Sequence, residues 1–169
     1  MTGERPTSGD GFIECSDGHV RWGVFGAAGA VFVHLDEDAA ADPDAEPAVL
    51  LQLRSAYSHE GGTWSCPGGA LHGSEAALDG ALRESEEEIG AVPTPHRLLG
   101  EHVFAPAVDW TYTSVVIAVP HRFGAPRNFE TEAVDWVAVS EVTSRPLHAG
   151  FLAAWADLVP IVLSVTAHG

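Results

Sequence analysis

The stretch that decides the fold runs from Gly69 to Gly90 and reads GALHGSEAALDGALRESEEEIG. Its spacing predicts one helix over Ser74–Ile89, because apolar residues three and four apart fall on one face of a helix. That face consists of Leu78, Leu82, Ser85 and Ile89, with Ala81 beside them. A helix with one apolar stripe packs that stripe against the rest of its domain.

The ends of this helix carry recognisable signals. Ser74 is the expected N-cap, and Glu75 suits the positive end of the helix dipole. Gly90 is the expected C-terminal stop. Gly80, in the interior, costs about 1 kcal/mol against alanine, and the sequence offers no compensation for that cost.

Three glutamates of the helix, Glu84, Glu87 and Glu88, fall within about 100° of arc. Their arc lies opposite the apolar stripe, so we expect them on a solvent-facing surface. Like charges at this spacing destabilise a helix, a cost that a bound hard cation would remove. Mg²⁺ prefers carboxylate oxygens and bridges to substrate phosphates. A glutamate run alone is usually just a solvated face, so the spacing of the whole stretch has to decide.

That spacing resembles the Nudix box: Gly, five residues, Glu, seven residues, Arg-Glu, an apolar residue, any residue, Glu-Glu, any residue, Gly and an apolar residue. Two positions depart from the pattern, Ser85 and the weakly apolar Ala91, and neither is a proposed ligand. The resemblance extends over about residues 20–160 and implies an α/β (α+β) fold, a mixed β-sheet between helices. The matching fixed positions are Gly69, Glu75, Arg83, Glu84, Glu87, Glu88 and Gly90.

By this resemblance the protein is a Mg²⁺-dependent (or Mn²⁺-dependent) hydrolase that cuts the diphosphate linkage of a small nucleotide. The resemblance makes Glu84 and Glu88 the main metal ligands, and Glu87 a ligand of a second ion or of its waters. A backbone carbonyl of Gly68 or Gly69 would complete the shell. Such a metal polarises a phosphoryl oxygen and activates water.

The resemblance also assigns roles around the metal. Arg83 would orient the box carboxylates, with Glu75 in the same network; the alternative is an ordinary surface pair worth a few tenths of a kcal/mol. In the family the general base is a box glutamate or an acid from a distant loop. The loop NFETEAVDW offers Glu130 and Glu132, of which we favour Glu132. Either acid can equally be a solvated loop residue.

Aromatic and basic residues near the box are candidates for binding the base and ribose, because aromatic rings stack on bases. Of these, Trp64 and Phe104 are more typical of a core. Pro106 lies in a region where a proline is associated with ADP-ribose cleavage in the family. The candidates are Arg54, Trp64, Phe104, Trp110 and Tyr112.

The composition of the chain argues against some classes of binding partner. The 169 residues carry a net charge of −16, with 8 Lys and Arg against 24 acids, which argues against nucleic acid polymers and anionic membranes. The apolar runs Val115–Val119 and Leu158–Val165 are short for a membrane helix. Two cysteines, Cys15 and Cys66, form no metal-spaced pair, and the N-terminus lacks a secretory pattern. We expect a cytoplasmic protein.

The remaining sequence predicts a single domain over 19–169 behind an N-terminal arm, 1–18. Two strands, Gly23–Leu35 and Ala48–Leu53, are expected to form a hairpin across an acidic surface loop, Asp36–Pro47. Specificity is expected in loops 54–63 and 104–112. The other expected elements are strands at Arg97–Phe104, Thr111–Val119 and Val134–Val139 and a closing helix at Leu147–Leu158.

Two other functions stay open on the sequence. A non-catalytic nucleotide sensor could use the same fold, although every box glutamate is present. A scaffold with an acidic helix is the third reading. The group attached to the diphosphate is also open: ADP-ribose leads, followed by oxidised or ordinary nucleoside triphosphates and dinucleoside polyphosphates. A homodimer is possible, as family members often form one.

Overall fold

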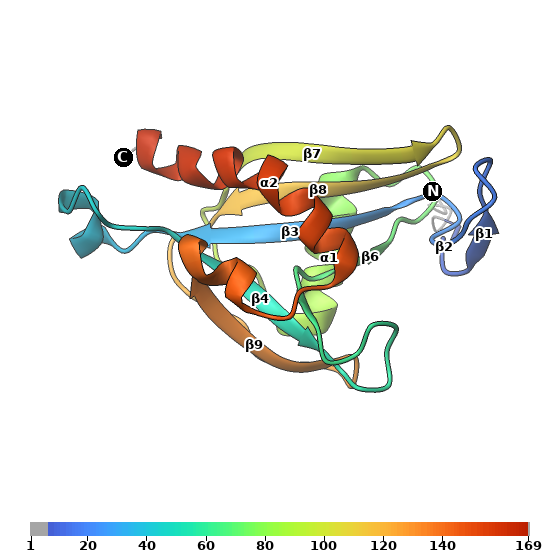
Figure 1. Ribbon diagram of the computed structural model, residues 1–169, viewed down its shortest axis with the longest axis horizontal. Helices are drawn as coiled ribbons and strands as arrows, with labels where there is room; N and C mark the ends of the chain where they lie inside the picture. Colours follow the sequence, from blue (N-terminus) through green and yellow to red (C-terminus); the bar gives the residue numbers. More distant parts are fainter. Residues whose placement is uncertain (1–6, 169) are drawn as a thin grey trace, which may run out of the picture.

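A mixed β-sheet with one helix against each face makes up the computed structural model, which describes residues 7–168 (Figure 1). The long strands are β3 (Ala27–His34), β4 (Ala48–Arg54), β7 (Arg97–Ala107), β8 (Trp110–Ala118) and β9 (Thr131–Ala138). The short strands are β1 (Phe12–Glu14), β2 (Val20–Trp22), β5 (Trp64–Ser65) and β6 (Gly68–Ala70). The helices are α1 (Ala77–Ile89) and α2 (Ala149–Leu163), with 3₁₀ turns η1 (Glu37–Ala41), η2 (Val139–Ser144) and η3 (Ser164–His168).

The strand order of the seven-stranded sheet is β5-β4-β3-β8-β7, with β6 also on β3 and β9 also on β4. β3 and β8 are parallel, and the other pairs are antiparallel. β3 and β4 pair only at Val33–Val49 and His34–Ala48, and then they diverge. β6 pairs with the start of β3 and β5 with the end of β4, so the segment 64–70 fills the fork between the two strands.

Alternate side chains of the central strand β3 supply both halves of the core, as expected for a strand covered on both faces. Val31 and Val33 pack on the side of α2, whereas Ala30 and Phe32 pack on the side of α1. All four are fully buried. The two helices therefore lie on opposite faces of the sheet, and a feature on α1 is separated from α2 by the strand layer.

Helix α2 is more apolar than we expected. Together with the turn that follows, Ala149–Thr166 has a mean hydropathy of 1.7 over 18 residues, enough by length and composition alone to cross a membrane. In the described structure 22% of this window is buried, and one side of α2 places four buried side chains in the cluster beneath it. These are Phe151, Trp155, Leu158 and Val162.

The predicted hairpin of β3 and β4 is confirmed by their antiparallel pairing. The acidic loop between them contains the 3₁₀ turn η1, which the sequence did not indicate. The N-terminal arm is partly a hairpin: β1 and β2 pair, and the predicted boundary after residue 18 falls at their turn. Ser16 N–H donates to Asp109 and ties this hairpin to the β7–β8 turn. Residues 1–6 of the arm lie outside the described part of the chain.

The box helix starts later than its sequence indicates. Helix α1 begins at Ala77 with Ala76 at its N-cap position, so Ser74 is not the N-cap. Ser74 has a φ of 67° and belongs to the preceding turn. The predicted stop is confirmed, because Gly90 ends the helix with a φ of 101°, a region that glycine enters without steric cost.

The structure explains two unfavourable residues of α1, Gly80 with its low helix propensity and Ser85 on the apolar face. A Cβ on Gly80 would lie 2.3 Å from Leu71 Cδ2, so the missing side chain lets the loop before α1 pack directly on the helix. That contact compensates for the weak helix propensity of Gly80. Ser85 is fully buried, and its hydroxyl donates to the Ala81 carbonyl at 2.6 Å, which satisfies it within the helix.

Candidate active site

The centre of the site is a hydrogen-bond network around Arg83. Its guanidinium donates to both carboxylate oxygens of Glu75, at 3.0 Å each, and to Glu84 Oε1 at 3.0 Å. It also donates to the Ala70 carbonyl at 2.9 Å and lies 3.5 Å from a Glu87 oxygen. The planar fork of arginine suits this bidentate geometry. One cation thus joins the loop before α1 to the acidic face of the helix.

Glu75 closes the loop on itself. Its Oε1 accepts a hydrogen bond from the backbone N–H of His72 at 3.0 Å while the same carboxylate receives Arg83. The hydrogen bonds from Arg83 hold the pKa of Glu75 below its usual value. Glu75 is therefore a charged link between the loop and helix α1. This role explains why Glu75 lies before the helix and not in its first turn.

Glu88 occupies the most unusual environment. Its side chain points into the fork between β3 and β4, and the residue is 5% exposed. The N–H of Gly68 donates to Glu88 Oε2 at 3.3 Å, and the Gln52 side chain also hydrogen-bonds the carboxylate. Burial raises the pKa of Glu88 to about 8. Within residues 7–168 no Lys, Arg or His side chain lies within 4 Å of it.

Glu84 lies against the backbone of β6. A Cβ on Gly69 would come within 2.6 Å of the Glu84 carboxyl carbon, so only glycine leaves room for this carboxylate. Burial raises the pKa of Glu84, and the nearby charges of Glu87 and Asp10 raise it further. The cluster therefore carries more negative charge than its single arginine balances.

The acidic face of α1 is mostly not open to solvent, contrary to our expectation. Glu84 has a side-chain exposure of 14%, and only Glu87, at 58%, faces outward. The helical wheel places these residues away from the core stripe, but β6 covers a second side of the helix. Carboxylate repulsion is stronger in this semi-buried position than on a solvated face.

The candidate substrate residues lie in different places. Arg54, at the end of β4, donates from Nε to the His59 carbonyl at 2.9 Å and acts electrostatically on Cys66 and Tyr112. Tyr112 is partly buried, and its hydroxyl lies 3.8 Å from Cys66 Sγ, beneath the glycines of the fork. Burial raises the pKa of both groups, so neither ionises near neutrality. Arg54 is partly exposed and lies beside the loop that carries His59.

Trp110 belongs to a small core cluster with Cys15 and Ala27. Its indole N–H donates to the Trp22 carbonyl at 3.3 Å, and the guanidinium of Arg21 covers its ring at 5.3 Å. This position indicates packing against the N-terminal hairpin in place of base stacking. Trp64 lies under the guanidinium of Arg145, at 4.6 Å, and packs against the core beneath α2, whereas Phe104 is half exposed.

The two acids of the loop before β9 differ. The charge of Glu130 raises the pKa of Glu88, which places Glu130 near the buried carboxylate, and its carbonyl accepts from Ser55 N–H at 3.0 Å. Glu132 is exposed and lies where the β9 register against β4 shifts between Leu53 and Arg54. The geometry therefore favours Glu130 over our choice, Glu132, as the acid nearest the site.

Sequence reasoning missed three residues at the site. Gln52, on β4, is 4% exposed and hydrogen-bonds Glu88, and Thr131 Oγ1 donates to Gln52 Oε1 at 3.2 Å. Asp10, from the N-terminal segment, acts on Glu84. A glutamine in the otherwise apolar run AVLLQL, residues 48–53, was the one signal in the sequence that could have indicated Gln52.

Comparison with known proteins shows the family and the fold of the chain. The family model for the NUDIX domain matches residues 28–157. A Mycobacterium tuberculosis protein, provisionally named 8-oxo-dGTP diphosphatase 3, is 41% identical over 155 residues, covering 89% of this chain and 69% of its own. A Bifidobacterium longum nucleoside triphosphate pyrophosphatase/Nudix hydrolase fusion protein is 33% identical, covering 87% of this chain and 30% of its own. The crystal structure of the M. smegmatis Nudix hydrolase RenU superposes with a TM-score of 0.74 at 31% identity, covering 93% and 97%.

Proposed function

This chain belongs to the Nudix hydrolase family, whose enzymes cleave pyrophosphate bonds of nucleotide derivatives, and from that premise we propose a Mg²⁺-dependent hydrolase of nucleoside triphosphates. The observation that carries the proposal is the buried carboxylate of Glu88. A charged group in this position is costly unless a cation neutralises it, and no Lys, Arg or His of the described chain does so.

The donor set fits Mg²⁺ or Mn²⁺. Glu84 and Glu88 offer hard carboxylate oxygens, and Glu87 offers a third at the solvent edge. The backbone of Gly69 lies against the Glu84 carboxylate, and its carbonyl is our candidate for a further ligand. When bound, the metal supplies Lewis acidity to a phosphoryl oxygen and lowers the pKa of its water.

The protein side chains would supply orientation and proton transfer. Arg83 holds Glu84 and is itself held by Glu75, so the rotamers of these carboxylates are set before substrate arrives. Gln52 and the Gly68 N–H hold Glu88 in the fork. Glu130 is our candidate to accept the proton of the attacking water, and Arg54 our candidate to contact a substrate phosphate.

The substrate proposal rests on the relatives. The M. tuberculosis relative bears the name of an 8-oxo-dGTP diphosphatase, which favours triphosphates, including oxidised purines, over ADP-ribose, the substrate that the sequence put first. Pro106, in β7, keeps ADP-ribose as the second candidate. The free, buried cysteines Cys15 and Cys66 suit the reducing cytoplasm that we propose as the location.

The experiment compares 8-oxo-dGTP, dGTP, ADP-ribose and a dinucleoside polyphosphate as substrates of chelator-stripped protein, with and without Mg²⁺. Triphosphates should give the monophosphate and pyrophosphate only when metal is present. Glu88→Gln should lower kcat by several orders of magnitude, because it removes a proposed metal ligand while keeping the shape of the side chain.

Glu86→Gln is the matched control, since Glu86 lies on the same helix, is exposed and is no part of the box pattern. It should leave turnover within a few-fold. Full activity after exhaustive chelation would refute the metal mechanism. Nucleotide binding without turnover of any substrate would instead support the sensor.

A further inference from the structure

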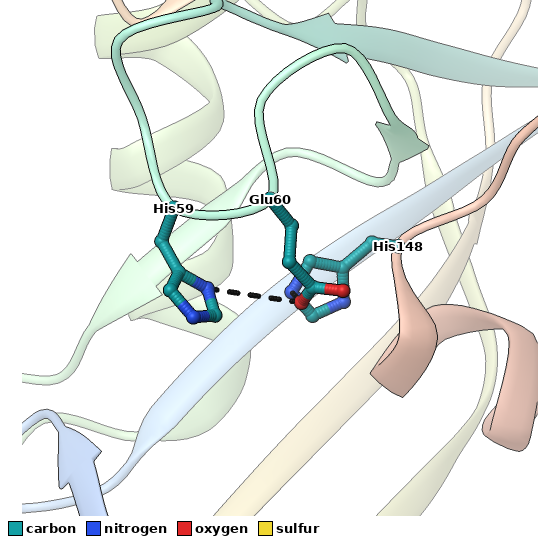
Figure 2. Close-up of side chains that lie close together, drawn as sticks. All are labelled: His59, Glu60 and His148. Carbon is teal, nitrogen blue, oxygen red and sulfur yellow. Dashed lines mark ion pairs between the residues drawn. The ribbon is translucent and has the colours of Figure 1, made fainter.

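A second group of metal-ligating side chains lies away from the box, where the β4–β5 loop meets the start of α2. Figure 2 shows His59 and Glu60 from the loop and His148 from the N-cap position of α2, with their side chains turned toward one another. One candidate ligand atom of each residue lies within 4.8 Å of those of the other two. Glu60 Oε2 lies 2.6 Å from His148 Nε2 and 3.7 Å from His59 Nδ1.

The backbone holds each of these residues in place. Glu60 adopts a φ of 53°, and its Oε1 accepts the N–H of Ala149 in the first turn of α2, at 3.2 Å. The N–H of His148 donates to the Trp64 carbonyl at 2.9 Å, and the carbonyl of His59 accepts from Arg54. Two segments almost 90 residues apart in the chain are thereby fixed side by side, so the three side chains do not meet by a chance of loop conformation.

We propose that His59, Glu60 and His148 bind a borderline divalent transition metal of the Zn²⁺ class. Two imidazoles and one carboxylate are the ligand types that Zn²⁺ uses in sites with an open position. The exposure of the three side chains, 85% for His59, 30% for Glu60 and 28% for His148, leaves that position to water.

The geometry needs only small adjustments. Zn–N and Zn–O bonds of about 2.0–2.1 Å in a tetrahedral site put ligand atoms about 3.4 Å apart. The contact of Glu60 with His148 would therefore lengthen from 2.6 Å, and His59 would move slightly closer from 3.7 Å. His59 is free to do so because its ring is exposed on the loop surface.

His148 links the site to helix α2. Its Nδ1 accepts the N–H of Gly150 at 3.1 Å, so in the metal-free protein the ring proton of the neutral imidazole lies on Nε2 and points to Glu60. A neutral imidazole has one lone pair. Metal on Nε2 would move the ring proton to Nδ1 and end the hydrogen bond from Gly150. Metal binding would thus exchange a helix cap for a cross-link between loop and helix.

This site is distinct from the box in position and in chemistry. The box carboxylates are on α1, and His148 starts α2, on the opposite face of the sheet. Mg²⁺ prefers oxygen ligands, whereas imidazole favours Zn²⁺, so Mg²⁺ can occupy the box while the second site is titrated.

The test is a Zn²⁺ titration of tag-free, chelator-stripped protein in millimolar Mg²⁺, followed by calorimetry, with Co²⁺ absorption as the report on nitrogen ligation. We expect one Zn²⁺ per chain and a higher Tm on binding. His59→Ala and His148→Ala should each weaken binding at least about tenfold, the least that ligand support at metal sites is worth. His59→Ala separates loss of a metal ligand from loss of stability, because the exposed His59 ring caps no helix, whereas the His148 ring does.

His102→Ala is the control, since His102 also pairs with a carboxylate, Asp157 at 3.3 Å, but has no third ligand in the described structure. It should change Zn²⁺ affinity by less than about twofold, and Glu88→Gln should leave the site intact. The proposal is wrong if wild-type protein binds no Zn²⁺ beyond the Mg²⁺-blocked box, or if His59→Ala binds as wild type does. Loss of Zn²⁺ in Glu88→Gln alone would assign the ion to the box.

Discussion

Gly69 and Glu84 approach each other so closely that a Cβ on the glycine would lie 2.6 Å from the carboxyl carbon of the glutamate. Gly69 has no positive φ, so alanine can adopt its backbone conformation without strain. Any effect of a side chain at this position therefore acts through the position of Glu84. Glycine is required here by the space that the Glu84 carboxylate occupies, and not by the backbone conformation of β6.

Gly69→Ala should displace Glu84 and weaken Mg²⁺ binding, with kcat falling by about tenfold to a hundredfold, the range seen when support of metal ligands is removed. The circular dichroism spectrum should stay native. Activity measured against Mg²⁺ concentration checks this. Gly73→Ala is the control, because a Cβ there meets its nearest atoms at an ordinary 3.5 Å, and unequal Mg²⁺ dependence of the two variants is the expected result.

The raised pKa of Glu88 predicts that the metal-free protein loses stability as pH rises. Below pH 4.5 the carboxyl is protonated in both states. Between pH 4.5 and about 8 the unfolded chain releases this proton while the folded chain retains it, so unfolding is favoured progressively. Above about pH 8 the penalty is constant, and its total is on the order of a few kcal/mol.

Denaturant unfolding in chelator at pH 5, 6.5 and 8 measures this effect. Glu88→Gln should be less sensitive to pH across the window and more stable than wild type at pH 8, and Mg²⁺ should stabilise wild type most at pH 8. The control Glu86→Gln should follow the wild-type curve. Identical pH dependence of wild type and Glu88→Gln would show that Glu88 is ionised at ordinary pH in the folded protein.

Gln52 should affect the pH at which Glu88 ionises and can bind a metal ion. Its hydrogen bond lowers the pKa of Glu88, so Gln52→Leu should raise that pKa further and shift the acidic limb of the kcat/KM profile to higher pH. Thr131→Val, which frees Gln52 Oε1 but leaves the amide donor, should produce a smaller shift in the same direction. A loss of activity that raised pH does not recover would indicate misfolding of the fork instead.

Gly80→Ala should destabilise the protein, although alanine favours helix by about 1 kcal/mol. The new methyl group would press on Leu71 Cδ2, 2.3 Å from the Cβ position, and on Glu75 Oε1 at 2.8 Å. Overpacking of this kind typically costs about 1–3 kcal/mol, which outweighs the gain in propensity. Thermal unfolding checks the sign, with the exposed Asp79→Ala as the neighbouring control; a rise in Tm for Gly80→Ala would contradict the close packing.

Local spacing was sufficient to predict the helix, its glycine stop and the β3–β4 hairpin, because each depends on residues near one another in the chain. The start of the helix was wrong because Glu75 serves the loop and Arg83 in place of the helix dipole, which periodicity does not reveal. The burial of Glu88 was also missed, since it depends on the divergence of β3 and β4.

The rest of the site could not be predicted from the sequence, because it depends on contacts between distant segments. Gln52 reaches Glu88 only because β4 leaves β3 and runs toward the end of α1, a matter of strand register. Trp110 and Tyr112 alternate with Thr111 and Thr113 in the sequence, as an aromatic binding face would, yet the N-terminal hairpin covers Trp110. Neither pairing has a signature within its own stretch of sequence.

The contacts within residues 69–84 also indicate whether this segment could be grafted into another protein of the same fold. Arg83, Glu75, Leu71 and Gly80 satisfy one another within the segment itself, so residues 69–87 form a cassette that should keep its shape when grafted into a related sheet. Glu88 is the exception, since its partner Gln52 belongs to the recipient strand. A graft into a sheet with an apolar residue in place of Gln52 should therefore keep the hydrogen bonds of Arg83. It should need a higher pH for activity, because Glu88 would ionise only at higher pH.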